Sequence, residues 1–243
     1  MKLFKIAAVL CSFVVFACSP KYYIPNSHQV TMFTEQGDVN LALSGDGNQY
    51  EIQAAYAMTD LFSAAANFSR FSPNDQDNGD GGSGWLFEAG PGFYKSFGDD
   101  LVFETYALLG FGSVENYFPS KMDSMNLEPN IEATAIRFAL QPGISKLYNR
   151  FSIGVSTRLS SLNYANIKGN LFFDGINQVT YLEENKSNFL IEPAITARFG
   201  TEKVRAQAQY GFSVNASNKE FLQNRQYLSI GLNINMNLGD IDL

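Results

Sequence analysis

Apolar and polar residues alternate with a period of two through most of the chain after residue 37. In the stretch 227–238 (YLSIGLNINMNL), every second residue is Leu, Ile or Met, and most residues between them are Ser, Gly or Asn. Successive side chains of a β-strand point to opposite faces, so this pattern predicts a strand with one apolar and one small polar face. Such a strand fits a transmembrane barrel with lipid outside and a narrow lumen inside.

Repetition of this pattern defines the predicted fold. Long loops at 71–84, 116–131, 163–187 and 216–225 alternate with short turns, as in outer-membrane barrels with an even number of strands. We predict an all-β, antiparallel up-and-down transmembrane barrel of ten strands. The alternative is an eight-stranded core with a trailing hairpin, if the first and tenth strands do not pair. The ten predicted strands span 38–46, 49–59, 61–70, 85–97, 101–115, 132–147, 150–162, 188–200, 203–215 and 226–238.

The N-terminus has the features of a secretory signal. Residues 1–17 combine two early lysines with an apolar core, which predicts a signal peptide. The segment Val15-Phe16-Ala17-Cys18 resembles a bacterial lipobox, which makes Cys18 a candidate for lipidation. Ordinary cleavage near Ala17 is the alternative.

The segment between the signal and the first strand shows no clean alternation. We interpret residues 18–37 as a periplasmic tether from the lipidated Cys18, followed by the barrel at 38–243. The single histidine of the chain, His28, then lies outside the barrel. Because short turns face the periplasm in such barrels, the loop lengths predict that the N- and C-termini are both periplasmic.

Charged residues gather on the polar phase of the predicted strands. An arginine on the lipid side costs about 2–4 kcal/mol, whereas an arginine inside can bind carboxylates in a bidentate manner. These charges therefore either fill the lumen with ion pairs or line a constriction for small charged solutes. The predicted network comprises Glu51, Glu88, Glu104, Arg137, Arg158, Glu192, Arg198 and Arg205.

Three prolines fall on the outward face of predicted strands. They are Pro91, Pro142 and Pro193. Proline lacks the N–H that a β-ladder needs, so each is expected at a bulge or at a local gap in pairing.

Composition excludes several classes of function. A net charge of −7 without a basic patch argues against nucleic-acid binding. After the first twenty residues no apolar run is long enough for a membrane-spanning helix. One histidine outside the barrel allows no Ser-His-Asp arrangement, and His/Cys metal sites are absent from the sequence. We therefore expect no enzyme, no cofactor and no metal.

The longest loop, 163–187, carries candidate contact residues. Asp174-Gly175 favours a tight hairpin turn between two strand-like runs at 171–173 and 178–182. Phe172, Phe173 and Tyr181 are candidates for contacting an external ligand, or for packing on neighbouring loops. The ligand itself is not specified.

A family resemblance follows from the first part of the chain. Tyr22–Asn26 (YYIPN), Met32–Asp38 (MFTEQGD) and Tyr50–Thr59 (YEIQAAYAMT) resemble the start of outer-membrane β-barrel proteins of Bacteroidetes. The resemblance implies a lipoprotein-type signal and an outer-membrane location, but no uniform activity. Surface-export signals of that group place acidic residues after the lipidated Cys. Here Ser19-Pro20-Lys21 follows, which implies an anchor on the periplasmic leaflet.

These features lead to three functional hypotheses. The first is a non-enzymatic outer-membrane barrel with a structural or loop-mediated surface-binding role. Its partners are outer-membrane lipid and the barrel assembly machinery, whose recognition signal resembles Ser229-x-Gly231-x-x-Ile234-x-Met236. The alternatives are a narrow porin or transporter for small solutes, and a soluble lipocalin-like barrel with its apolar face inward.

Overall fold

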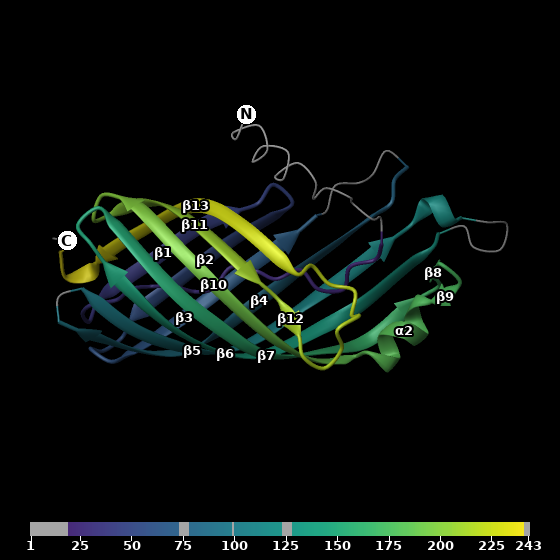
Figure 1. Ribbon diagram of the computed structural model, residues 1–243, viewed down its shortest axis with the longest axis horizontal. Helices are drawn as coiled ribbons and strands as arrows, with labels where there is room; N and C mark the ends of the chain where they lie inside the picture. Colours follow the sequence, from purple (N-terminus) through teal and green to yellow (C-terminus); the bar gives the residue numbers. More distant parts are fainter. Residues whose placement is uncertain (1–18, 73–77, 99, 123–127, 241–243) are drawn as a thin grey trace, which may run out of the picture.

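A single antiparallel sheet closes on itself in this computed structural model, which describes residues 19–72, 78–98, 100–122 and 128–240 (Figure 1). The barrel has ten strands, because the short β12 continues β11 along β10. Its strands are β1 (Asp38–Gly45), β2 (Gln49–Ala57), β3 (Phe62–Phe71), β4 (Gly81–Phe97), β5 (Leu101–Tyr117), β6 (Asn130–Leu147), β7 (Phe151–Gly169), β10 (Ser187–Gly200), β11 (Val204–Phe212), β12 (Val214–Asn215) and β13 (Gln226–Asn237). The predicted signal peptide, Cys18 and segments 73–77 and 123–127 lie outside the described residues.

Closure of the barrel is made by the first and last strands. β1 pairs with β13 from Asp38↔Asn237 to Gly45↔Ile230, and every other strand pairs with its neighbour in sequence. The predicted ten-stranded, up-and-down barrel is therefore confirmed, and the eight-stranded alternative does not apply. β4, β6 and β7 extend further into the long-loop end than the alternation predicted.

Each of the three outward prolines lies beside a gap in the ladder. Two residue pairs are missing between β4 and β5 at Pro91, and two between β6 and β7 at Pro142. The same gap separates β11 from β12 opposite Pro193 on β10. The register is unchanged across each gap, so the prediction of local pairing gaps is confirmed, and no bulge forms there.

The outer face of the barrel is apolar, and the inner face is polar. Along β11, for example, exposed and buried residues alternate without a break. An apolar outer face is the reverse of what the lipocalin-like alternative requires. Large exposed apolar residues on the strands include Leu43, Ile52, Phe62, Phe87, Leu109, Phe111, Phe138, Ile153, Val155, Ile195, Phe199, Val204, Leu228, Ile230 and Leu232.

A further stretch of chain runs inside the barrel. Residues 19–36, here called the inner segment, pass through the lumen ahead of β1, as the purple trace shows in Figure 1. Residues 25–33 are all buried, and His28 is fully enclosed. The expectation of a tether outside the barrel, with His28 in it, is therefore wrong. An extended segment that is surrounded on every side produces no period-two pattern, which is why the alternation failed to predict this position.

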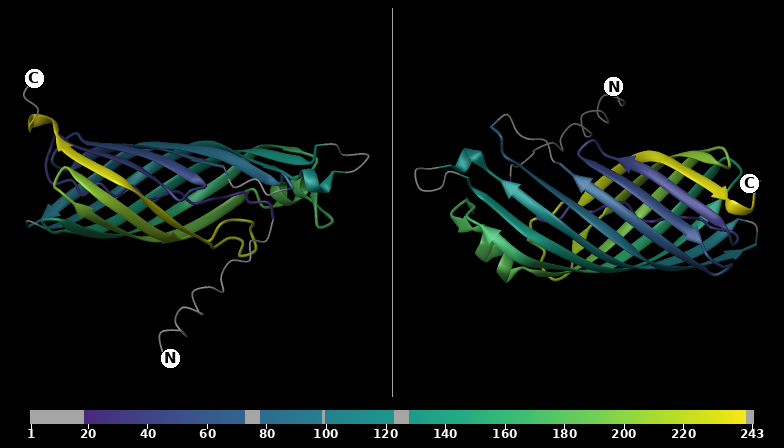
Figure 2. Two further views of the ribbon diagram at one scale, coloured as in Figure 1. Left: turned by 90° about the horizontal axis from the view of Figure 1, so that it is seen from above. Right: turned by 180° about the vertical axis from the view of Figure 1, so that it is seen from behind.

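The inner segment runs from one end of the barrel to the other. At the long-loop end, the Tyr22 N–H donates to the Leu222 carbonyl at 2.8 Å. At the short-turn end, the Gly37 carbonyl accepts from the Leu238 N–H at 3.0 Å. The first described residues and the C-terminal η2 helix (Leu238–Asp240) therefore lie at opposite ends (Figure 2). The side on which each terminus itself lies stays a prediction, because residues 1–18 and 241–243 are outside the described chain.

The long-loop end carries the remaining secondary structure. β8 (Phe172–Phe173) and β9 (Ile176–Asn177) form a short hairpin at the predicted Asp174-Gly175 turn, where the two residues have φ values of 50° and 77°. The second predicted run is instead a helix, α2 (Gln178–Glu184), because the Asn177 side chain caps its first turn. The short η1 helix (Pro119–Lys121) lies nearby. Among the described residues, no helix is long and apolar enough to cross a membrane.

Candidate functional site

The lumen contains two buried ion pairs. Arg137 on β6 donates from Nε to Glu88 Oε1 on β4 at 2.7 Å, and its Nη2 pairs with the second carboxylate oxygen. Arg158 on β7 donates from Nε to Glu192 Oε2 on β10 at 2.8 Å. All four side chains have no solvent exposure. The structure thus brings together half of the predicted charge network as two pairs.

A glycine on the strand between makes room for the first pair. Gly110 on β5 lies between Glu88 and Arg137 in the sheet register. A Cβ at this position would lie 2.9 Å from Glu88 Cγ and 3.4 Å from Arg137 Cβ. The missing side chain therefore lets the two charged groups meet across β5.

Two residues of the inner segment join the ion pairs into one network. The Asn26 amide lies between Glu88 and Arg137, donating to the carboxylate at 3.1 Å and accepting from the guanidinium at 2.6 Å. The Tyr23 hydroxyl donates to Glu192 at 2.8 Å and accepts from Arg137. The inner segment is therefore part of the charge network rather than a filler beside it.

Next along the inner segment, the barrel binds backbone groups. The Ser27 N–H donates to Glu51 at 2.8 Å, and the Ser27 carbonyl accepts from Gln53 at 3.1 Å. Gln209 contacts His28 twice, accepting from its N–H at 2.6 Å and donating to its carbonyl at 3.2 Å. These side chains substitute for the strand partner that an extended backbone would otherwise need.

The same mode of contact continues toward the short-turn end. The Gln29 carbonyl accepts from Gln141 at 2.6 Å, and the Val30 carbonyl accepts from Arg198. The other contact of the Arg198 guanidinium is also neutral: its Nε donates to Gln207 at 2.7 Å. Among the described residues, Arg198 makes no ion pair with a carboxylate.

Glu104 holds the last part of the segment. Its carboxylate accepts from the backbone N–H groups of Thr31 at 3.0 Å and Met32 at 3.2 Å, and from the Thr31 hydroxyl at 2.6 Å. Tyr106 contacts the same hydroxyl at 2.7 Å. Glu104 is buried, so these donors replace the water that a carboxylate loses on burial.

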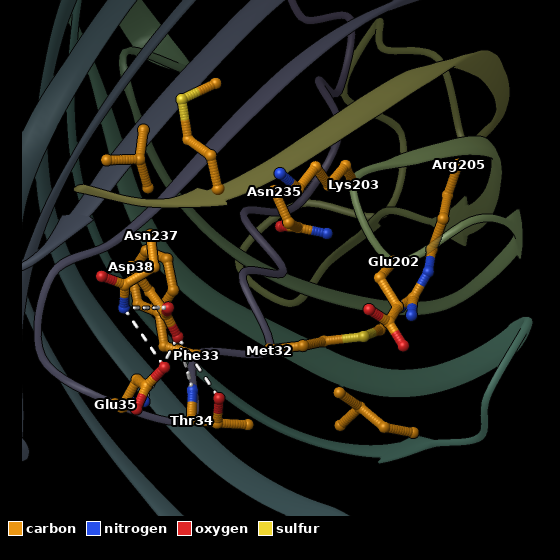
Figure 3. Close-up of a pocket in the computed structure, with 13 residues that line it drawn as sticks. Met32, Phe33, Thr34, Glu35, Asp38, Glu202, Lys203, Arg205, Asn235 and Asn237 are labelled. Atoms are coloured by element: carbon orange, nitrogen blue, oxygen red, sulfur yellow. Dashed lines mark hydrogen bonds between the residues drawn. The ribbon is translucent and has the colours of Figure 1, made fainter. Parts of the chain in front are cut away.

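The eighth predicted charge, Arg205, lies at the short-turn end. Its Nε donates to the Thr201 carbonyl at 3.0 Å, away from the central network. Arg205 lines a cavity of about 290 Å³ where the inner segment leaves the lumen (Figure 3). Asp38 closes the exit turn by accepting from the backbone N–H of Thr34 at 2.9 Å.

Aromatic residues surround the inner segment at the long-loop end. Tyr22 stacks on Tyr181 of α2 with ring centroids 5.9 Å apart, and the Tyr164 hydroxyl donates to the Tyr22 carbonyl at 2.6 Å. Of the predicted loop contacts, Tyr181 and Phe173 are engaged within the protein, the latter against Phe118 at 5.1 Å. Of the three, Phe172 alone is among the exposed residues, with 56% of its surface accessible.

Sequence reasoning missed several residues that hold the segment. They include Gln53, Gln141 and Gln209, which lie on the same inward phase as the predicted charges. A period-two reading that included amides as well as charges would have selected them.

The only histidine of the chain contacts a serine of the barrel wall. His28 Nδ1 lies 2.7 Å from Ser156 Oγ, while Nε2 has no hydrogen-bond partner among the described residues. The described residues also contain no group of three or more His, Cys, Asp or Glu side chains placed to hold a metal ion.

Fold and site together define a class of protein: a closed antiparallel barrel, apolar outside and polar inside, with its own N-terminal segment in the lumen. No model of a known protein family matches the chain. A comparison with curated proteins gives no match either.

Proposed function

We propose that this chain is a non-enzymatic outer-membrane β-barrel protein whose lumen is closed by the inner segment, with a structural or surface-binding role at the long-loop end. The apolar outer face supports this proposal. Soluble monomers rarely expose a contiguous apolar patch larger than a few hundred Å², whereas exposed apolar side chains here recur on every strand of the barrel wall. Lipid is the solvent that suits such a surface.

The contents of the lumen favour a closed barrel over an open pore. Glu51, Glu104 and Arg198 use their hydrogen-bonding groups on the inner segment, and the two ion pairs are bridged by it. Removing the segment would leave buried charges without partners, which is costly. A narrow porin or transporter, the second candidate, requires the segment to leave or shift.

Single-channel recording distinguishes the two candidates. The mature chain is refolded into a planar bilayer, and folding is checked by heat-dependent gel mobility. We expect a folded barrel without steady current. Steady current from the unaltered protein would instead support the porin. Recovery of the folded protein in the soluble periplasm after cell fractionation would contradict the membrane location itself.

The direction of the inner segment bears on the lipid anchor. Ser19 lies at the long-loop end, beside Lys21, whose backbone N–H donates to Asn116 at 2.9 Å. Cys18 directly precedes Ser19 in the sequence. Under this proposal the long loops face outward, so a lipid on Cys18 belongs to the outer leaflet. The proposal therefore differs from the periplasmic leaflet that the sequence resemblance implies.

A further inference from the structure

The lumen contacts the inner segment largely through its backbone. Between Asn26 and Met32, backbone carbonyls and N–H groups are hydrogen-bonded by side chains of the barrel rather than by other strands. The barrel side chains that do this are Arg158, Glu51, Gln53, Gln209, Gln141, Arg198 and Glu104. They come from β2, β5, β6, β7, β10 and β11, so they surround the segment.

The side chains of the inner segment between Asn26 and Met32 make fewer hydrogen bonds to the barrel than its backbone does. Gln29 is bound through its carbonyl, while both polar atoms of its side-chain amide have no hydrogen-bond partner among the described residues. Val30 is likewise held by its carbonyl. Asn26, His28 and Thr31 do add side-chain hydrogen bonds. Every residue except proline offers the same backbone groups, so such a site can accept different sequences.

We infer that the lumen is a binding site for an extended peptide of about seven residues, recognised through its backbone, and that the inner segment is its intramolecular occupant. Because a closed barrel has no free strand edge, its side chains supply the hydrogen bonds that an edge strand supplies in strand addition. The ligand class is an extended polypeptide segment from another chain. This inference goes beyond the proposed function and depends only on the lumen, not on where the barrel is located.

The link between occupant and barrel is short and accessible. Thr34, Glu35 and Gln36 are exposed and join the segment to β1. A short link of this kind gives the occupant an effective concentration in the millimolar range. Cutting the link removes this high effective concentration, so an added peptide can compete with the segment for the lumen.

The experiment uses the full chain with a specific protease site inserted in the exposed 34–36 turn. The protein is folded in detergent, cut at the turn, unfolded in denaturant and refolded with an excess of a labelled synthetic peptide of residues 19–34. Native mass spectrometry then reports which peptide each folded barrel contains, and gel mobility confirms folding. We expect the labelled peptide to occupy the lumen in proportion to its excess.

Altered peptides test whether the backbone is recognised. N-methylation at His28 removes the N–H that donates to Gln209, and N-methylation at Thr31 removes the N–H that donates to Glu104. Each change should lower occupancy about tenfold or more. N-methylation at Val30, whose N–H makes no hydrogen bond among the described residues, is the matched control. That control and a Gln29→Ala peptide should stay within about twofold of the parent.

Three results would overturn the inference. The refolded barrels could exclude the labelled peptide, the Gln29→Ala peptide could lose as much occupancy as the N-methylated ones, or the cut chain could fail to refold at all. The last result would make the segment a part of the folding unit rather than a ligand. None of these outcomes touches the proposed membrane location, which fails only if the folded protein does not partition into membranes.

Discussion

Truncating Arg137 to alanine should destabilise the folded barrel strongly. Arg137 has no solvent exposure and hydrogen-bonds to Glu88, Tyr23 and Asn26. In the Arg137→Ala variant, Glu88 keeps only the Asn26 amide donor at 3.1 Å. Leaving one partner of a buried ion pair without its counter-charge costs about 3–5 kcal/mol. That is a large share of a total stability of about 5–15 kcal/mol.

The chain has a built-in reporter and a matched control for this measurement. Trp85, the single tryptophan, lies on β4 at 37% exposure and stacks on Phe68. Its fluorescence can follow reversible urea unfolding in lipid vesicles. The control is the Lys168–Glu132 pair, whose side chains are 73% and 45% exposed. Because exposed ion pairs contribute about 0–1 kcal/mol, Glu132→Gln should lower the free energy of unfolding by no more than about 1 kcal/mol.

A double variant separates charge from packing. Arg137→Met combined with Glu88→Leu removes both charges, so no uncompensated charge stays buried. The remaining loss comes from Asn26 and Tyr23, whose polar groups lose partners, at about 1–3 kcal/mol. The double variant should therefore be more stable than Arg137→Ala. Equal or lower stability, or a loss in Arg137→Ala no larger than in the exposed control, would refute the reasoning.

Three further outcomes can be tested. Glu104→Ala removes the acceptor for two backbone N–H groups of the inner segment, so intermittent current should appear in planar bilayers where the unaltered protein is silent; continued silence from a folded variant would contradict it. Gly110→Val should destabilise the barrel by about 1–3 kcal/mol, as overpacking does, because a Cβ there meets Glu88 at 2.9 Å. An impermeant maleimide on intact cells should label Phe172→Cys at the long-loop end but not Glu202→Cys at the short turns, and the reverse result would invert the proposed orientation.

The barrel wall could be predicted from the sequence because its two faces meet different surroundings. Strands such as β2 and β10 alternate between outward apolar residues and inward polar ones, and their predicted bounds agree closely with the structure. Even the ladder gaps follow from chemistry local to Pro91, Pro142 and Pro193. Local pattern and local chemistry were sufficient for these features.

The inner segment could not be predicted in the same way. Its residues meet barrel side chains on all sides, so no alternation marks them. Its partners are spread over the barrel, from Glu51, 24 residues beyond Ser27, to Gln209, 181 residues beyond His28. The helix α2 was missed for a different reason. The run 178–182 has a strand-like pattern, but the Asn177 side chain caps the first turn of a helix there.

Barrel size explains why the inner segment and the lumen charges belong together. The diameter of a barrel grows with its number of strands, and eight strands enclose a space that side chains alone can fill. Ten strands enclose more. Here one extended chain takes up the added space, and small lumen residues accommodate it: a Cβ on Gly154 would lie 3.4 Å from Val30 Cγ1. An extended backbone brings N–H and C=O groups without strand partners into a buried space, where each needs a hydrogen-bond partner. Charged and amide side chains that point inward do this, so the residues predicted as a lumen charge network are also those that bind the inner segment.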